Sequence, residues 1–160
     1  MYSEHALTIA IFLPIVGAVL VLATGGDQNA PLARRLSLMV ALLAFAATIP
    51  LYTGFNPKLA QMQFVVDWVW IEAFNVHYRI GIDGISMPLI LLTSFSTLLV
   101  VIASWVVIER KVAQYMAAFL VMEGLMIGVF GALDAMLFYV FWEALLVPMF
   151  LIIGLWGGPN

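Results

Sequence analysis

The chain has 160 residues, of which 65% are hydrophobic and 9% are charged, with a formal net charge of -3. These fractions differ strongly from those of ordinary soluble domains and predict an integral membrane protein surrounded by a lipid bilayer. The absence of cysteine excludes disulfides and Cys-ligated iron–sulfur clusters in this chain, and the lack of a basic patch argues against nucleic acid as a partner.

Five apolar runs are long enough to cross a bilayer as helices. The first is expected to be a retained span, because Met1–His5 lacks the positive charges of a secretory signal. The sequence therefore predicts an all-α membrane protein, with residues 1–160 forming a single membrane region. The predicted spans are 7–24, 36–52, 85–108, 112–133 and 135–156.

The connections between the runs predict the orientation of the chain. Arg34 and Arg35 precede the second run, and Glu109–Lys111 joins the third run to the fourth. Because basic loops stay on the cytoplasmic side, the N-terminus is predicted on the outer face of the membrane.

The segment Gly54–Asp83 is the sizeable piece outside the predicted spans. Phe64–Ile71 is rich in β-branched and aromatic residues and Val76–Ile80 alternates apolar with polar residues, which predicts an outer-face β-hairpin turning around Glu72–Asn75. Tryptophans favour membrane interfaces. We expect Trp68 and Trp70 at the outer interface, and Trp105 and Trp156 at the inner one.

Polar residues at the span ends have structural interpretations. Asp83 is expected to cap the third helix, and Asp134 suits the first turn of the fifth, where the helix dipole favours an anion. The two histidines, His5 and His77, lie outside the spans, so neither is a candidate haem ligand within the bilayer.

The stretch Phe138–Phe150 carries one carboxyl group and one proline within an otherwise apolar span. An ionisable group inside a membrane span is costly and is by default a functional-site hypothesis. Pro148 has no N–H to donate to the carbonyl of Ala144, which leaves an acceptor for water one residue from Glu143. We predict that Glu143 is a proton-relay carboxyl; the alternative is a permanently protonated Glu143 that hydrogen-bonds a neighbouring helix.

Glu123 is the second candidate. It lies eleven residues before Asp134 and Glu143 lies nine after it, so both are roughly 14–16 Å from the turn and close to the bilayer centre. Desolvation opposes ionisation of such groups and a nearby cation favours it. In the structural alternative Glu123 joins helices by hydrogen bonds, since Gly124 and Gly128 mark a close-packing helix face. The sequence leaves the facing of the two carboxyls open.

Three runs of residues, Ile80–Ser86, Gly128–Asp134 and Phe138–Gly157, closely resemble subunit M of bacterial NADH:quinone oxidoreductase, respiratory complex I. The most specific part is Trp142-Glu143 followed by Leu146–Met149. The resemblance covers nearly all of the chain and is strongest from about residue 78 onward.

The resemblance implies a proton-translocating, antiporter-like subunit of the membrane arm in the bacterial inner membrane, with other membrane-arm subunits as partners. It implies no cofactor in this chain, with NADH, FMN, iron–sulfur clusters and quinone in other subunits of the oxidoreductase. Glu143 matches the glutamate that pairs with a lysine on a later, broken helix in that family. Family members are longer, so the chain is expected to be the N-terminal part of a larger subunit.

Two other functions stay open from the sequence. The chain could belong to a multisubunit cation/proton antiporter of the same superfamily, whose subunits are similar around the glutamate. A purely structural membrane protein is the third hypothesis, in which neutral substitutions at Glu123 and Glu143 change only assembly or stability.

Overall fold

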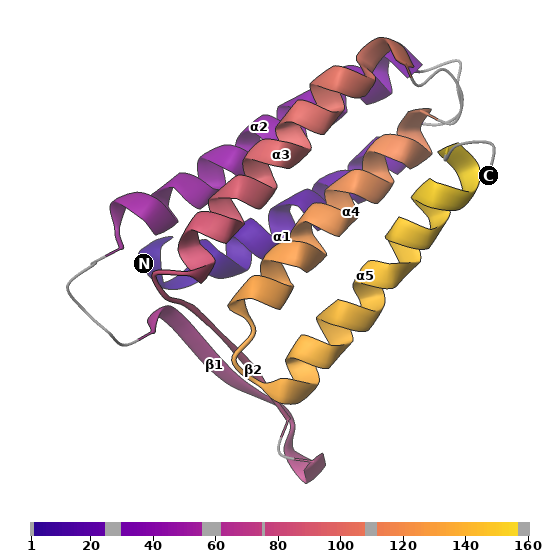
Figure 1. The fold of residues 1–160 in the computed structure, drawn as a ribbon. Helices are drawn as coiled ribbons and strands as arrows, with labels where there is room; N and C mark the ends of the chain where they lie inside the picture. Colours follow the sequence, from indigo (N-terminus) through magenta and orange to yellow (C-terminus); the bar gives the residue numbers. More distant parts are fainter. Residues whose placement is uncertain (1, 25–29, 56–61, 75, 108–111, 157–160) are drawn as a thin grey trace.

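The computed structural model describes residues 2–24, 30–55, 62–74, 76–107 and 112–156. Five helices run side by side, and a two-stranded antiparallel sheet lies at one end of them (Figure 1). The helices are α1 (Tyr2–Leu22), α2 (Ala30–Thr53), α3 (Ser86–Val107), α4 (Val112–Gly131) and α5 (Ala135–Trp156), and the strands are β1 (Gln63–Ile71) and β2 (Val76–Ile82). The predicted fold of five helices and one hairpin is confirmed.

Within the described residues, four helices (α2, α3, α4 and α5) are long and apolar enough to cross a membrane. The apolar part of α1, Ala6–Leu22, is shorter. Its rise of about 25 Å lies near the lower limit for a span. The chain is a multi-pass membrane protein.

Helix α4 lies at the centre of the bundle and packs against α1, α2, α3 and α5. Its approach to α1 depends on Gly124, where a Cβ atom would collide with the carbonyl oxygen of Ile11 and the side chain of Ile15. On the α5 side, a Cβ at Gly128 would lie 2.9 Å from ring carbons of Phe141. Small residues let helix backbones approach closely in a membrane, where packing contacts drive association. Of the four longer apolar helices, α4 is accordingly the most buried and α5 the least.

The hairpin is attached to the helices through β2. Thr8 Oγ1 and Tyr78 Oη are 3.2 Å apart and share a hydrogen bond. Leu133 N donates to Arg79 O at 2.8 Å, and Ile80 forms an isolated bridge with Ala132. Burial raises the pKa of the Tyr78 phenol, and the hydrogen bond with Thr8 offsets part of that shift. These contacts hold the hairpin against α1 and the α4–α5 turn.

The hairpin itself follows the prediction closely. A short 3-10 helix, η2 (Glu72–Phe74), occupies the predicted turn between the two strands. Asp67 and Arg79 face each other across the strands, and Arg79 Nε donates to Asp67 Oδ2 at 3.1 Å. This ion pair is exposed, so it contributes little to stability.

Asp83, predicted as a cap, and Asp134, predicted in the first turn of the fifth helix, both cap helices. Asp83 Oδ1 accepts hydrogen bonds from the backbone nitrogens of Ser86 at 2.8 Å and Ile85 at 3.0 Å, and Asp83 N donates to Ser86 Oγ at 2.9 Å. Asp134 Oδ1 accepts from the backbone nitrogen of Met136 at 2.9 Å. The interpretation of Asp83 as the cap of the third helix is confirmed, and Asp134 caps α5 from the residue before its first turn.

Some sequence predictions fall outside the described part of the chain. They concern the connection Glu109–Lys111 and the side chains of Trp68, Trp70, His77 and Trp156. Trp105 is half-buried. The two aromatic belts therefore stay a prediction.

The contact between α1 and α4 can be tested by enlarging Gly124. We expect Gly124→Val to lower the free energy of unfolding by about 1–3 kcal/mol, because the added methyl groups force α1 and α4 apart. The measurement is thermal unfolding of the complete protein in detergent. Gly154→Val is the matched control, since a Cβ at Gly154 in α5 meets no described atom within 4 Å. Equal losses in the two variants would contradict the assignment of a tight contact to Gly124.

The cap at Asp83 can be tested by substitution and pH. Asp83→Ala should lower the free energy of unfolding by about 1 kcal/mol, whereas Asp83→Asn should retain most of it, because asparagine is an equally good N-cap. Backbone N–H groups of Ser86 and Ile85 lower the pKa of Asp83 in the folded chain.

The charge-dependent part of this stabilisation is complete above the unfolded-state pKa of about 3.9 and is lost as pH falls through the lower, folded-state value. The stability difference between wild type and Asp83→Ala should therefore shrink as the pH falls from about 3.9 through the lower, folded-state pKa of Asp83. A difference that stays constant down to strongly acidic pH would show that the ionised Asp83 is not the stabilising form.

Candidate functional site

Glu123 is buried inside the bundle. It lies on α4 beside Gly124, whose close contact with α1 helps to seal this side of the helix. Its side chain is 1% exposed, and neither carboxylate oxygen has a hydrogen-bond partner among the described residues. An ionised carboxylate without partners is costly in an apolar interior, so this group needs a proton, a water molecule or a cation.

Buried hydroxyl groups of the bundle have hydrogen-bond partners. Thr48 Oγ1 and Ser94 Oγ, 3.0 Å apart, join α2 to α3. Ser104 Oγ and Tyr115 Oη, 2.9 Å apart, join α3 to α4. The carboxyl of Glu123 thus differs from these hydroxyl groups, because neither of its oxygens has a hydrogen-bond partner among the described residues.

The Ser104–Tyr115 hydrogen bond also shows where Glu123 lies along α3. The two helices run in opposite directions (Figure 1). Eight residues along α4 from Tyr115 lead to Glu123, and eight back along α3 from Ser104 lead to Ser96, a rise of about 12 Å in both cases. The carboxyl therefore lies at the depth of the turn Thr93–Thr97, which carries buried hydroxyls. Sequence reasoning missed this polar layer, although four hydroxyl residues clustered in an apolar span were its signal.

Glu143 lies on the outward side of α5. Leu137, Phe141, Leu145 and Pro148 recur every three or four residues and form the buried stripe of this helix. Glu143 follows Phe141 by two residues, a rotation of about 200°, and is exposed. Its carboxyl group is therefore directed away from α4.

The surroundings of Glu143 on α5 are aromatic and apolar. Phe138 and Trp142 are both exposed, and their rings stack with centroids 6.1 Å apart. Pro148 lies inside the helix, so its nitrogen cannot bond the carbonyl oxygen of Ala144. The carbonyl oxygen of Ala144, next to Glu143, can thus accept a hydrogen bond from water or from a donor side chain.

The structure does not bring the two carboxyls together. Glu123 is enclosed by the bundle, whereas Glu143 is on the exposed face of α5. The contact of Gly128 with Phe141, six residues before and seven after Asp134, agrees with the predicted similar depth of the two carboxyls. No cluster of three or more His, Cys, Asp or Glu side chains that could hold a metal occurs among the described residues.

The fold and these groups define a class of protein. It is a multi-pass helical membrane protein with one carboxyl sealed inside its bundle and a second on an exposed face of an apolar helix. Residues 9–130 match the family described as "NADH-ubiquinone oxidoreductase chain 4, amino terminus". The chain belongs to this family, and the resemblance noted in the sequence is confirmed.

Individual relatives agree with the family. The chain is 48% identical to "NADH-quinone oxidoreductase subunit M" of Rhodobacter capsulatus over 98% of this chain and 31% of that subunit. It is 36% identical to "NADH-ubiquinone oxidoreductase chain 4" of Chondrus crispus over 96% of this chain and 31% of the relative.

A solved structure also matches. A chain of "Respiratory complex I from Thermus thermophilus with bound NADH" superimposes with a TM-score of 0.77 and 27% identity, covering 94% of this chain and 29% of the other. The present chain thus spans less than a third of the length of each of these relatives.

The enclosure of Glu123 makes a prediction about stability. Replacing a buried, unpartnered polar group by an apolar one of similar shape removes its desolvation cost, so Glu123→Met should raise the free energy of unfolding by about 1–3 kcal/mol. Thermal unfolding of the complete protein in detergent measures this change. Leu120→Met, a fully buried substitution one turn away, is the control and should cost less than about 1.5 kcal/mol. A lower stability of Glu123→Met than of Leu120→Met would mean that the carboxyl has a bound partner such as water.

Proposed function

We propose that the chain is the N-terminal part of an antiporter-like membrane-arm subunit of NADH:quinone oxidoreductase, and that it contributes to proton translocation coupled to electron transfer from NADH to quinone. The match of residues 9–130 to the family supports the assignment to this complex. The observation that carries the proton-relay role is the position of Glu143, a carboxyl on the exposed face of the apolar helix α5.

The proposed chemistry is proton uptake and release by Glu143. In apolar surroundings a carboxyl group keeps its charge only when a cation or hydrogen-bond donors approach it. A cationic side chain that moves toward Glu143 favours loss of the proton, and one that moves away favours its recovery. Since Glu143 faces away from α4, the cation, proposed to be a lysine, would come from a segment beyond the described helices.

Glu123 is proposed as a second, interior proton site. Its two oxygens have no partner among the described residues, so the group has unused hydrogen-bonding capacity inside the bundle. The polar turn Thr93–Thr97 lies at the same depth. A proton would reach Glu123 through water or through rotation of such hydroxyl groups.

The redox chemistry is proposed to lie in other subunits. This chain has no cysteine to ligate an iron–sulfur cluster. NADH, FMN, iron–sulfur clusters and quinone would accordingly bind elsewhere in the complex, and other membrane-arm subunits would be the partners of this chain. We propose the bacterial inner membrane as its location. The N-terminus would lie on the outer face, because Arg34 and Arg35 lie near the start of α2, at the opposite end of α1 from the N-terminus.

The test is Glu143→Gln in the complete complex in native membranes. Glutamine keeps the size and polarity of the side chain but cannot release a proton at physiological pH. We expect proton pumping and NADH:quinone activity to fall together by at least about tenfold, since loss of a proton-transfer group typically costs that much or more. Glu143→Asp should retain part of both activities.

Glu72→Gln is the matched control, because Glu72 is an exposed carboxyl on the hairpin, away from the apolar spans. It should pump at the wild-type rate. Normal pumping by an assembled Glu143→Gln complex would remove Glu143 from the relay, and equal losses in Glu143→Gln and Glu72→Gln would indicate a general assembly defect.

A further inference from the structure

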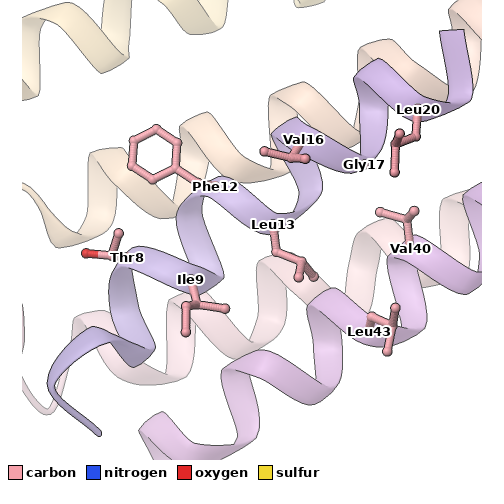
Figure 2. A pocket seen from close by; sticks show the side chains of 9 residues that line it. All are labelled: Thr8, Ile9, Phe12, Leu13, Val16, Gly17, Leu20, Val40 and Leu43. Carbon is pink, nitrogen blue, oxygen red and sulfur yellow. The ribbon is translucent and has the colours of Figure 1, made fainter. Parts of the chain in front are cut away.

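An open apolar groove runs along the surface of the bundle between α1 and α2. Figure 2 shows its lining side chains, which come from α1 between Thr8 and Leu20 and from Val40 and Leu43 of α2. Its volume is about 410 Å³. The groove is separate from both Glu123 and Glu143, neither of which lines it.

The lining of the groove suits an apolar ligand or an apolar part of a ligand. Thr8 is the single polar side chain among its lining residues, and its hydroxyl already shares a hydrogen bond with Tyr78 Oη at 3.2 Å. The ring of Phe12 lies beside that of Tyr78, with centroids 6.3 Å apart, at the same end. The Thr8 end therefore offers no free polar group to bind a charged headgroup.

The groove is somewhat longer than one leaflet of a bilayer. From Thr8 to Leu20 the rise along α1 is about 18 Å. The hydrocarbon core of a leaflet is about 15 Å thick, which is half of a typical bilayer core. A fatty acyl chain anchored in one leaflet thus fits the groove lengthwise.

A cation lies at the Leu20 end. Gly17 and Val40 are in such close contact that a Cβ at Gly17 would collide with Val40. Because α1 and α2 run in opposite directions (Figure 1), the five residues from Val40 back to Arg35 cover about 7.5 Å and end just beyond Leu20. Arg35 is exposed.

Arg35 lies beside the groove face of α2. Leu43, Met39 and Arg35 are neighbours at four-residue intervals, and Arg35 is rotated about 80° around the helix from Leu43 and about 140° from Val40. Leu43 lines the groove, and Met39 is exposed between it and Arg35. The guanidinium group reaches the end of the groove only if the long Arg35 side chain extends past Met39.

From this arrangement we propose that the α1–α2 groove binds an anionic membrane phospholipid. One acyl chain lies between α1 and α2, from Leu20 toward Thr8, and the phosphate of the headgroup contacts Arg35. A basic residue at the end of a groove between membrane helices has the charge that an anionic headgroup requires. The proposal rests on the membrane location of the chain and not on its role in proton transfer.

The test is photolabelling of the complete native assembly that contains this chain, purified in detergent. The probes are phosphatidylglycerol and phosphatidylcholine that carry the same acyl chain with a diazirine. Labelled peptides of α1 and α2 are quantified by mass spectrometry. We expect phosphatidylglycerol to label the groove about fivefold more than phosphatidylcholine, the preference that one arginine near a membrane surface supplies.

Three variants separate the two parts of the site. Arg35→Gln should abolish the preference for phosphatidylglycerol and leave residual labelling by both lipids. Val16→Trp places an indole in the groove and should reduce labelling by both. Val19→Trp is the matched control: Val19 is 62% exposed against 59% for Val16, but it does not line the groove, so labelling should be unchanged.

Equal labelling by the two lipids in the wild type would overturn the headgroup contact. Unchanged labelling in Val16→Trp would overturn the proposed acyl-chain site. Cross-linking of the groove to another protein subunit, with labelling by neither lipid, would overturn it as well. Co-purification of each variant with the assembly confirms that its chain has folded. Lipid labelling does not require proton pumping. The lipid-site proposal is therefore tested independently of the role of Glu143.

Discussion

The close approach of α4 to α1 at Gly124 is the constraint on which the rest of the bundle depends. In a bilayer, lipid tails are as apolar as the helices, so helices associate through packing contacts and hydrogen bonds. Because Gly124 has no side chain, the backbone of α4 can contact the Ile11 carbonyl oxygen and the Ile15 side chain of α1 directly. Helix α4 thereby becomes central, with α1, α2 and α3 around it and α5 at the edge.

That arrangement gives the two membrane carboxyls different environments. Glu123 belongs to the central helix and is enclosed on all sides by described residues. Glu143 belongs to the peripheral helix, on the face opposite the stripe that contacts α4. In the proposed proton pathway they are consequently two separate proton-binding sites. An interior carboxyl exchanges protons only through water or hydroxyl groups, whereas a carboxyl on a helix face can contact a side chain from another segment.

The hairpin explains how the ends of the helices are held while their middles remain apolar. Strand β2 bonds the α4–α5 turn through Leu133 and holds α1 through Thr8. Asp83 and Asp134 satisfy the first backbone N–H groups of α3 and α5 at the same end of the bundle. Backbone groups at the helix ends cannot form hydrogen bonds with lipid tails. At this end of the bundle the aspartate caps and the hairpin supply those bonds.

Local features of the sequence determined the elements of this protein. The presence and order of the helices, the hairpin and the cap at Asp83 follow from apolar runs, alternation and capping chemistry, which depend on neighbouring residues. The first two helices begin earlier than their apolar runs, at Tyr2 and Ala30, because polar residues extend a helix beyond the span. The similar depth of Glu123 and Glu143 follows from the constant rise of a helix on each side of Asp134, and the contact of Gly128 with Phe141 agrees with it.

Only the tertiary structure decided which way each side chain faces. The spans are apolar on all sides, so no polar stripe in the sequence distinguishes an inward face from an outward one. The enclosure of Glu123, the exposure of Glu143, the Thr48–Ser94 bond and the α1–α2 groove all depend on which helix packs against which. That choice is made by contacts between residues far apart in the chain, which local patterns do not encode.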